Sequence, residues 1–237
     1  MSPTRLSSER KKAHAGFGPA VSLTRVQIRL QIELSLEEYV AQKVWARARL
    51  LRCPLHPEGG CGFSSHGSYL RKYPMPFRIA RAYCPKGQTT FGLIPDFAAS
   101  HVPGTLPEIE AAVVVYEAEE NIYRAADIMR PPKELPGGRD PITQEATAQW
   151  LRRRVGWVRA MLITVAGLFP ELFSGCEMTL TAFRARLRSD SVLMDLRGIC
   201  AEELLALPIP VGFSPPSDNG KAPIGAVQQS LRSDRPP

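Results

Sequence analysis

Apolar and polar residues alternate along residues 25–34. Val26, Ile28, Leu30, Ile32 and Leu34 share one set of positions, and charged or amide side chains occupy the positions between them. Because successive side chains of a strand point to opposite faces, this pattern predicts a half-buried β-strand.

A helical pattern follows the strand. Ser35 and Glu38 have the spacing of a capping box, and apolar residues then recur every three or four positions as far as Leu51, which predicts an amphipathic helix. Residues 53–91 are instead rich in Gly, Pro and aromatic residues. They predict a hairpin of residues 68–73 and 77–83 that turns at residues 74–76, with a third short strand at residues 89–91.

The second half of the chain has helical periodicity. Thr105 and Glu108 form a second capping box, and a shorter helix is expected from Ile122 to Met129. A long helix is expected from Asp140 to Leu168, and one more over residues 180–205, interrupted near 189. The apolar stripe of the long helix consists of Leu151, Val155, Val158, Leu162 and Val165.

Composition narrows the class of protein. No apolar run approaches the roughly 18 residues that a membrane span requires. The N-terminal residues, which include Arg5, Arg10, Lys11 and Lys12, lack the apolar run of a secretory signal, so we expect a cytoplasmic protein that does not enter a membrane. Five cysteines in such a compartment favour a metal site over a disulfide framework.

Three of the cysteines gather around one histidine. The order Cys53-x2-His56-x4-Cys61, followed after a predicted hairpin by Cys84, supplies four ligands for a tetrahedral Zn²⁺ ion. Gly59 and Gly60 allow the tight turn that this spacing needs. The alternative is unligated cysteines around a Pro/Gly turn, and His66 is a competing ligand. Cys176 and Cys200 lie far away in helical sequence and are expected to be small core residues.

Charge is distributed unevenly. The net charge is +7, and residues 1–52 carry 10 basic and 4 acidic side chains, whereas residues 106–141 carry 4 and 8. The long predicted helix contains Gln149, Arg152, Arg153, Arg154 and Arg159. Arginines on an exposed helix face contact phosphates or guanine edges, which favours double-stranded DNA as a partner. The alternative is a solvated basic face.

These patterns predict an α+β fold, in which a small zinc-ribbon-like β module precedes a helical, helix-turn-helix-like bundle. We expect a disordered basic arm over residues 1–22 and a strand, helix and zinc-ribbon-like module over residues 23–104. A helical DNA-binding-like domain is expected over residues 105–206, and a disordered tail over residues 207–237.

A series of short motifs resembles the zinc-ribbon and helix-turn-helix proteins associated with bacterial insertion sequences, which include the N-terminal parts of transposases. In those proteins cysteine pairs flank an RHG-x-Y strand and a C-x-x-C-x-x-T-F strand, and a helix with a W-L-R-R-R-V segment follows. The matching segments are Cys53-Pro54-Leu55-His56-Pro57, Cys61-Gly62-Phe63, His66-Gly67-Ser68-Tyr69, Tyr83-Cys84-Pro85 and residues 89–96. The resemblance covers residues 53–168.

The resemblance implies that Cys53, His56 and Cys84 are metal ligands and that residues 152–154 lie in a DNA-facing helix. Two positions depart from the family pattern, because His56 replaces a cysteine and Gly87 stands where the last cysteine is expected. The loop over residues 130–139 is also long for a tight helix-turn-helix.

Three functions are compatible with the sequence. The first is a zinc-stabilised DNA-binding protein without a catalytic core, tied to a mobile element, where a transposase or recombinase would be its partner, or to transcription. The second is a zinc-stabilised adaptor that binds protein or RNA. A complete transposase is the least favoured, because strand cleavage needs carboxylates that converge on metal ions, and the acidic residues here lie mostly on predicted helix surfaces. We therefore expect no enzymatic activity.

Overall fold

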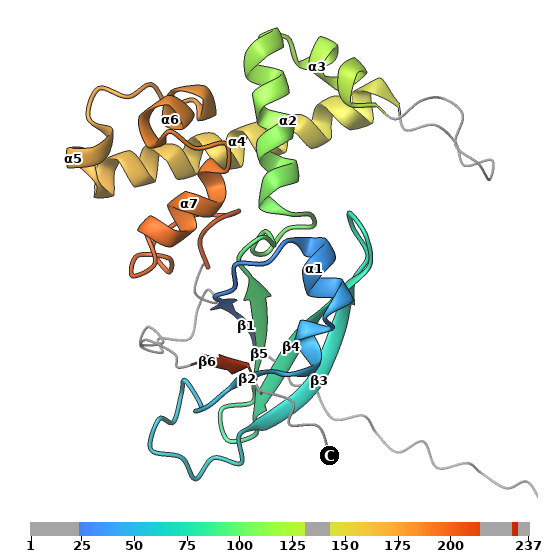
Figure 1. Cartoon of the computed structure of the whole chain (residues 1–237), viewed down its shortest axis with the longest axis vertical. Coiled ribbons are helices and arrows are strands. Elements are labelled where there is room, and N and C mark those ends of the chain that lie inside the picture. The colour runs from blue at the N-terminus through green and yellow to red at the C-terminus, as the bar shows by residue number, and fades with distance from the viewer. Residues whose placement is uncertain (1–23, 131–142, 214–228, 232–237) are drawn as a thin grey trace, which may run out of the picture.

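The structure is a computed structural model that describes residues 24–130, 143–213 and 229–231. Within those residues it is an α+β fold with a four-stranded sheet and seven helices. The sheet lies in one half of the molecule, and all helices but α1 lie in the other half (Figure 1). The strands of the sheet are β1 (Thr24–Leu30), β3 (Ser64–Arg71), β4 (Phe77–Cys84) and β5 (Thr89–Pro95).

The sheet has the strand order β1-β5-β4-β3. β3, β4 and β5 form an antiparallel meander, which confirms the predicted hairpin and third strand with longer elements. β1 joins this meander in parallel to β5, with Val26 opposite Phe91 and Ile28 opposite Leu93. Val26, Ile28, Leu30 and Ile32 of the alternating segment are buried as expected and Leu34 is partly buried, although the strand itself ends at Leu30.

The segment after β1 differs from its prediction. The Ser35 capping box is confirmed, but α1 (Leu36–Ala41) is short, and Lys43 has a left-handed backbone with φ 48°. A 3₁₀ helix, η1 (Val44–Ala46), and the strand β2 (Ala48–Leu50) follow, so the predicted helix to Leu51 is wrong. Apolar residues of this segment are buried against the sheet, and this tertiary packing overrides the helical periodicity.

The helical half follows the sequence prediction except for the short helix at residues 170–173, which was not predicted, and the last helix, which ends at Ile199 and not at residue 205. Its helices are α2 (Leu106–Glu119), α3 (Ile122–Met129), α4 (Gln144–Leu168), α5 (Pro170–Phe173), α6 (Leu180–Leu187) and α7 (Val192–Ile199). The capping box of Thr105 and Glu108 is present, and α6 and α7 are separated at the predicted interruption. Thr143 caps α4 through its side chain, whereas Asp140, the predicted start, lies outside the described residues.

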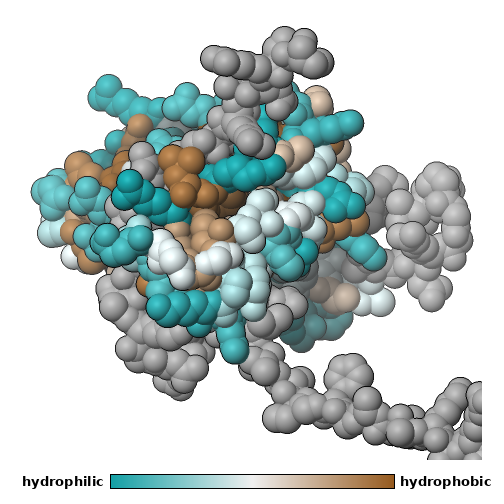
Figure 2. All heavy atoms as spheres, turned by 90° about the horizontal axis from the view of Figure 1, so that it is seen from below, coloured by the Kyte–Doolittle hydropathy of each residue, from teal (hydrophilic) through white to brown (hydrophobic). Residues whose placement is uncertain are grey.

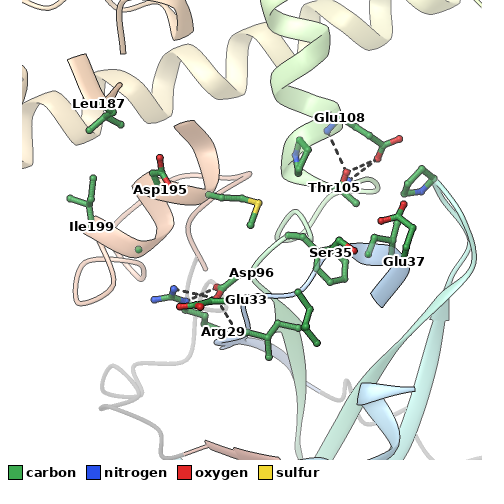
Figure 3. A pocket seen from close by; sticks show the side chains of 18 residues that line it. Arg29, Glu33, Ser35, Glu37, Asp96, Thr105, Glu108, Leu187, Asp195 and Ile199 are labelled. Carbon is green, nitrogen blue, oxygen red and sulfur yellow. Dashed lines mark hydrogen bonds and ion pairs between the residues drawn. The ribbon is translucent and has the colours of Figure 1, made fainter. Parts of the chain in front are cut away.

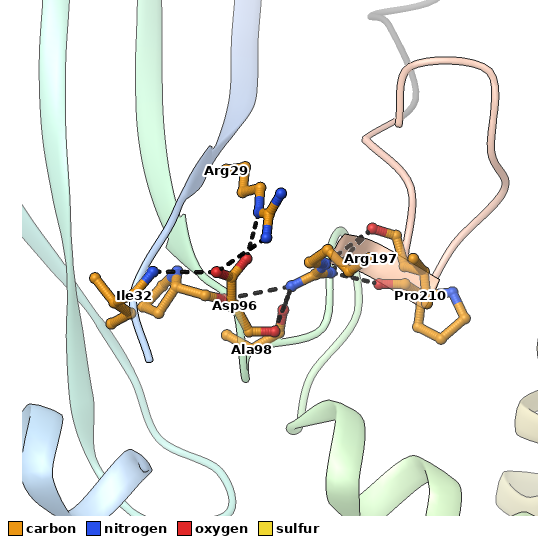
Figure 4. Close-up of polar contacts among 8 residues, drawn as sticks. Arg29, Ile32, Asp96, Ala98, Arg197 and Pro210 are labelled. Atoms are coloured by element: carbon orange, nitrogen blue, oxygen red, sulfur yellow. Dashed lines mark hydrogen bonds and ion pairs between the residues drawn. The ribbon is translucent and has the colours of Figure 1, made fainter. Parts of the chain in front are cut away.

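A buried arginine joins the sheet to the helices. Arg197 on α7 has no exposed surface, and its guanidinium donates hydrogen bonds to the backbone carbonyls of residues 95, 96, 98, 210 and 211 (Figure 4). Burial lowers its pKa to about 9, so it remains cationic at neutral pH. Next to it, the Asp96 carboxylate pairs with Arg29 Nε at 2.6 Å and accepts from Ile32 N at 3.1 Å.

The C-terminal part also differs from its prediction. Leu207, Val211 and Phe213 are buried in the core, and the short strand β6 (Gln229–Leu231) pairs antiparallel with β2, so the expected tail does not begin at residue 207. The predicted basic arm over residues 1–22 lies outside the described residues. None of the described helices has the length and apolar character needed to cross a bilayer.

Candidate metal centre and basic helix

The first three candidate ligands lie on one tight turn between β2 and β3. His56 N donates to Cys53 O at 3.2 Å, which closes a short turn around Pro54. Gly59 and Gly60 then adopt φ of 86° and 71°, a left-handed backbone that favours glycine. This reversal returns the chain to Cys61. The prediction that Gly59 and Gly60 allow this tight turn is therefore confirmed.

The fourth candidate ligand comes from the end of β4 and completes the cluster. The ligand atoms of Cys53, His56, Cys61 and Cys84 all lie within 4.8 Å of one another. His56 Nδ1 is 3.6 Å from Cys53 Sγ and 3.3 Å from Cys84 Sγ. In a tetrahedral zinc site the usual bond lengths place S and N ligands about 3.6 Å apart. The four side chains are thus close enough to hold a metal ion, and their separations fit zinc.

Burial distinguishes the cluster from its surroundings. The three cysteines are buried, although their neighbours Arg52, Glu58 and Gly62 are exposed. His66, the competing ligand, is exposed and lies against the Tyr83 ring, outside the cluster. Of the two distant cysteines, Cys200 is fully buried and Cys176 is partly buried.

The thiols differ in proton affinity. Burial, together with hydrogen bonds to Cys84 and Cys61, raises the pKa of the Cys53 thiol to about 11. For Cys61, burial acts to raise the pKa, but hydrogen bonds with the Phe63 backbone and with the other two thiols outweigh it, and the pKa is lowered. Because metals bind thiolates, a metal ion must displace protons from this cluster at neutral pH.

Gly87 borders the cluster at the position where the family pattern has a cysteine. A Cβ atom at Gly87 would lie 3.3 Å from Cys84 Sγ, 3.6 Å from His56 Cε1 and 2.6 Å from Leu55 Cδ1. Gly87 N also donates to Cys84 Sγ at 3.2 Å. Position 87, where the family pattern has a cysteine, therefore faces the cluster. The Leu55 side chain and the His56 ring occupy the space beside it. Sequence reasoning did not identify this contact of Leu55, for which the chain carries no motif.

The predicted DNA-contacting residues all lie on α4, but they differ in exposure. Gln149, Arg152, Arg153 and Arg159 are exposed, whereas the apolar stripe of the helix packs inward. Arg152 donates to Glu145 Oε1 at 3.1 Å and to the Tyr123 hydroxyl at 3.0 Å. Sequence reasoning missed both partners, although Glu145 lies two helical turns before Arg152.

Arg154 does not share this exposure. It is 5% exposed, its guanidinium stacks on the Trp150 ring at 3.7 Å from the centroid, and it donates to Trp150 O. Burial lowers its pKa to about 10. Residue 154 follows Leu151 by three positions, so it lies on the packed side of the helix. Arg154 is therefore part of the helix packing, contrary to its assignment to the DNA-facing set.

A large cavity lies where the end of β1 meets α2 and α7. Its volume is about 1120 Å³, and carboxylates of Glu33, Glu37 and Asp195 border it (Figure 3). Apolar side chains such as Leu187 and Ile199 line the part contributed by the helices. Asp96 and Glu108 also line the cavity, but they are engaged with Arg29 and Thr105. The acidic border does not favour a polyanion here.

Hydrophilic side chains cover much of the lower face of the molecule, and apolar groups gather in areas between them (Figure 2).

Comparisons of the chain with protein-family models, curated proteins and solved structures give no match.

Proposed function

We propose that this chain is a zinc-stabilised DNA-binding protein whose α4 contacts duplex DNA. The observation that carries the proposal is the exposed polar face of α4, where Gln149, Arg152, Arg153 and Arg159 face solvent on one helix. Guanidinium groups neutralise phosphates and form bidentate contacts to guanine, so three arginines beside Gln149 on a rigid helix suit a groove or backbone contact.

The metal part of the proposal is a structural zinc ion. Cys53, His56, Cys61 and Cys84 form a Cys₃His set, the closed ligand set that zinc takes in structural sites. A metal there would join the β2–β3 turn to the end of β4. With four protein ligands, no position is left for a reacting water molecule, so the ion would stabilise the fold.

The setting of the proposal comes from the sequence resemblance. The order of cysteine turn, hairpin and arginine-bearing helix supports a DNA-recognition part that works with a transposase or recombinase of a mobile element. Within the helical half, α3 packs beside α4, and this pair would act in the helix-turn-helix manner. Because Arg154 is buried, the proposed DNA-contacting surface of α4 consists of Gln149, Arg152, Arg153 and Arg159.

Duplex binding by fluorescence anisotropy at several salt concentrations tests the proposal. The double variant Arg152→Ala/Arg153→Ala should weaken binding about tenfold or more and reduce the slope of log K against log salt by about 2. The matched control is Arg186→Ala/Arg188→Asn at the C-terminal end of α6, which removes the same charge. Asn suits the left-handed backbone of residue 188, which caps the helix. Equal losses in both double variants, or binding that ignores salt, would contradict the proposal.

Single-stranded RNA is the second probe in the same assay. Binding of RNA in preference to duplex DNA, with the same dependence on Arg152 and Arg153, would support the RNA-binding adaptor in place of the DNA-binding protein. The metal content of each variant is measured alongside, so that a loss of fold is distinguished from a loss of contact.

A further inference from the structure

One face of the sheet borders a second cavity. Ala80, Ala82 and Phe91 are buried on one face of the sheet. On the other face, side chains of β1, β3, β4 and β5 border a cavity of about 640 Å³, together with the loop of residues 101–103. This volume lies within the range of small-molecule sites. The cavity is separate from α4, which contributes no residue to it.

The cavity is lined by cationic and aromatic groups. Arg71, Lys72 and Arg81 border it, with two histidines, and none of its described lining residues is Asp or Glu. This contrasts with the cavity at the end of β1, whose border carries several carboxylates. A concave surface with one sign of charge concentrates ligands of the opposite charge, so this cavity suits an anion.

Arg81 is the cation best placed to bind such an anion. Arg71 is already engaged, because it donates to Ala99 O at 2.7 Å. By contrast, the Nε atom of Arg81 is buried and has no hydrogen-bond acceptor among the described residues. An unsatisfied buried donor is costly, and a phosphate oxygen at the guanidinium would compensate that cost.

The aromatic part of the cavity lies beside Arg81. Gly92, the β5 partner of Arg81, has no side chain, and the ring of Tyr69 lies against it, since a Cβ atom there would be 3.6 Å from Tyr69 Cε1. Tyr73 borders the same cavity and is 49% exposed. Tyrosine rings on the face of a sheet are surfaces on which nucleobases stack.

We propose that this face of the sheet binds a nucleotide, with the phosphate on Arg81 and Lys72 and the base against Tyr69 and Tyr73. The ligand is either a free mononucleotide or an unpaired base of a single strand, since both present the same phosphate and planar ring. This site is independent of duplex binding by α4.

Calorimetry on the full chain tests the proposal with adenosine 5′-monophosphate, adenosine, inorganic phosphate and a short single-stranded oligonucleotide as probes. The nucleotide or the oligonucleotide should bind about tenfold or more tightly than adenosine and phosphate, since both contacts contribute. Binding of the mononucleotide identifies a free ligand, and binding of the oligonucleotide alone identifies a single strand. No binding of either, or phosphate as tight as the nucleotide, would overturn the proposal.

Single substitutions test whether the nucleotide binds to this face of the sheet. Arg81→Gln should weaken it about tenfold or more, because a charged hydrogen bond is lost. The matched control, Arg78→Gln on the same strand, faces the opposite side by strand alternation and should leave affinity within about twofold. If Arg81→Gln does not fold, exposed Lys72→Ala should still weaken binding several-fold. An equal effect of Arg78→Gln, or none of Arg81→Gln and Lys72→Ala, would refute the site. The Arg152→Ala/Arg153→Ala variant should bind the nucleotide normally even if duplex binding fails.

Discussion

Replacing Arg197 with Met removes the guanidinium that joins the sheet to the C-terminal segment but keeps most of the apolar stem. Five backbone carbonyls, from residues 95, 96, 98, 210 and 211, then lose a charged donor in a site without solvent exposure. At about 1 kcal/mol for each acceptor, the loss is about 5 kcal/mol. The variant no longer has to bury a cation, which reduces the loss to about 3 to 4 kcal/mol, a large share of the 5–15 kcal/mol typical of a domain.

Equilibrium unfolding in urea, followed by circular dichroism, measures the effect on the free energy of unfolding. Arg197→Lys keeps the charge with fewer donors and should lose less than Arg197→Met. Arg186→Ala is the control, because Arg186 is exposed and donates to one carbonyl, that of Ser174. This substitution should lower the free energy of unfolding by less than about 1 kcal/mol. If Arg197→Met unfolds within about 1 kcal/mol of the unchanged protein, the role given to this network is refuted.

Three further results are expected. Glu110 is 2% exposed and accepts a hydrogen bond from the backbone N–H of Val192 at 3.1 Å. Glu110→Ala should therefore lower the urea midpoint of unfolding by the equivalent of about 3 kcal/mol, and an unchanged midpoint would contradict this. Because the pKa of the Cys53 thiol is raised to about 11, the metal displaces a proton at neutral pH, and zinc affinity in a chelator competition should fall about tenfold or more from pH 7.5 to 6.5. A flat profile would contradict it. His56→Ser should lose the metal, as measured by mass spectrometry. The double variant His56→Ser/Gly87→Cys should regain it, since position 87 faces the cluster. If the double variant holds no metal, the geometry at position 87 is unsuitable for a ligand.

Much of the candidate site could be predicted because its determinants are local in sequence. Cys53, His56 and Cys61 lie on one turn that two glycines permit, and the hairpin of β3 and β4 returns the chain to Cys84. The capping boxes were predictable for the same reason, since each depends on two side chains three positions apart.

Features that depend on distant packing were not predictable. β1 pairs in parallel with β5, and β2 pairs with β6 from the C-terminal part of the chain; neither pairing leaves a pattern in either segment. Arg154 looked like its neighbours in a basic run, yet its contact with Trp150 places it inside. Arg197 likewise appears as one charge in an amphipathic helix, and only the fold shows the carbonyls around it.

The metal content of the purified chain tests the central claim most directly. Native mass spectrometry should find one zinc ion per chain, retained through buffer exchange and lost in Cys84→Ser. The control is Cys176→Ser, because Cys176 lies outside the cluster, and it should keep the ion. A chain that holds no metal after exposure to zinc, or equal loss in both variants, would contradict the metal centre.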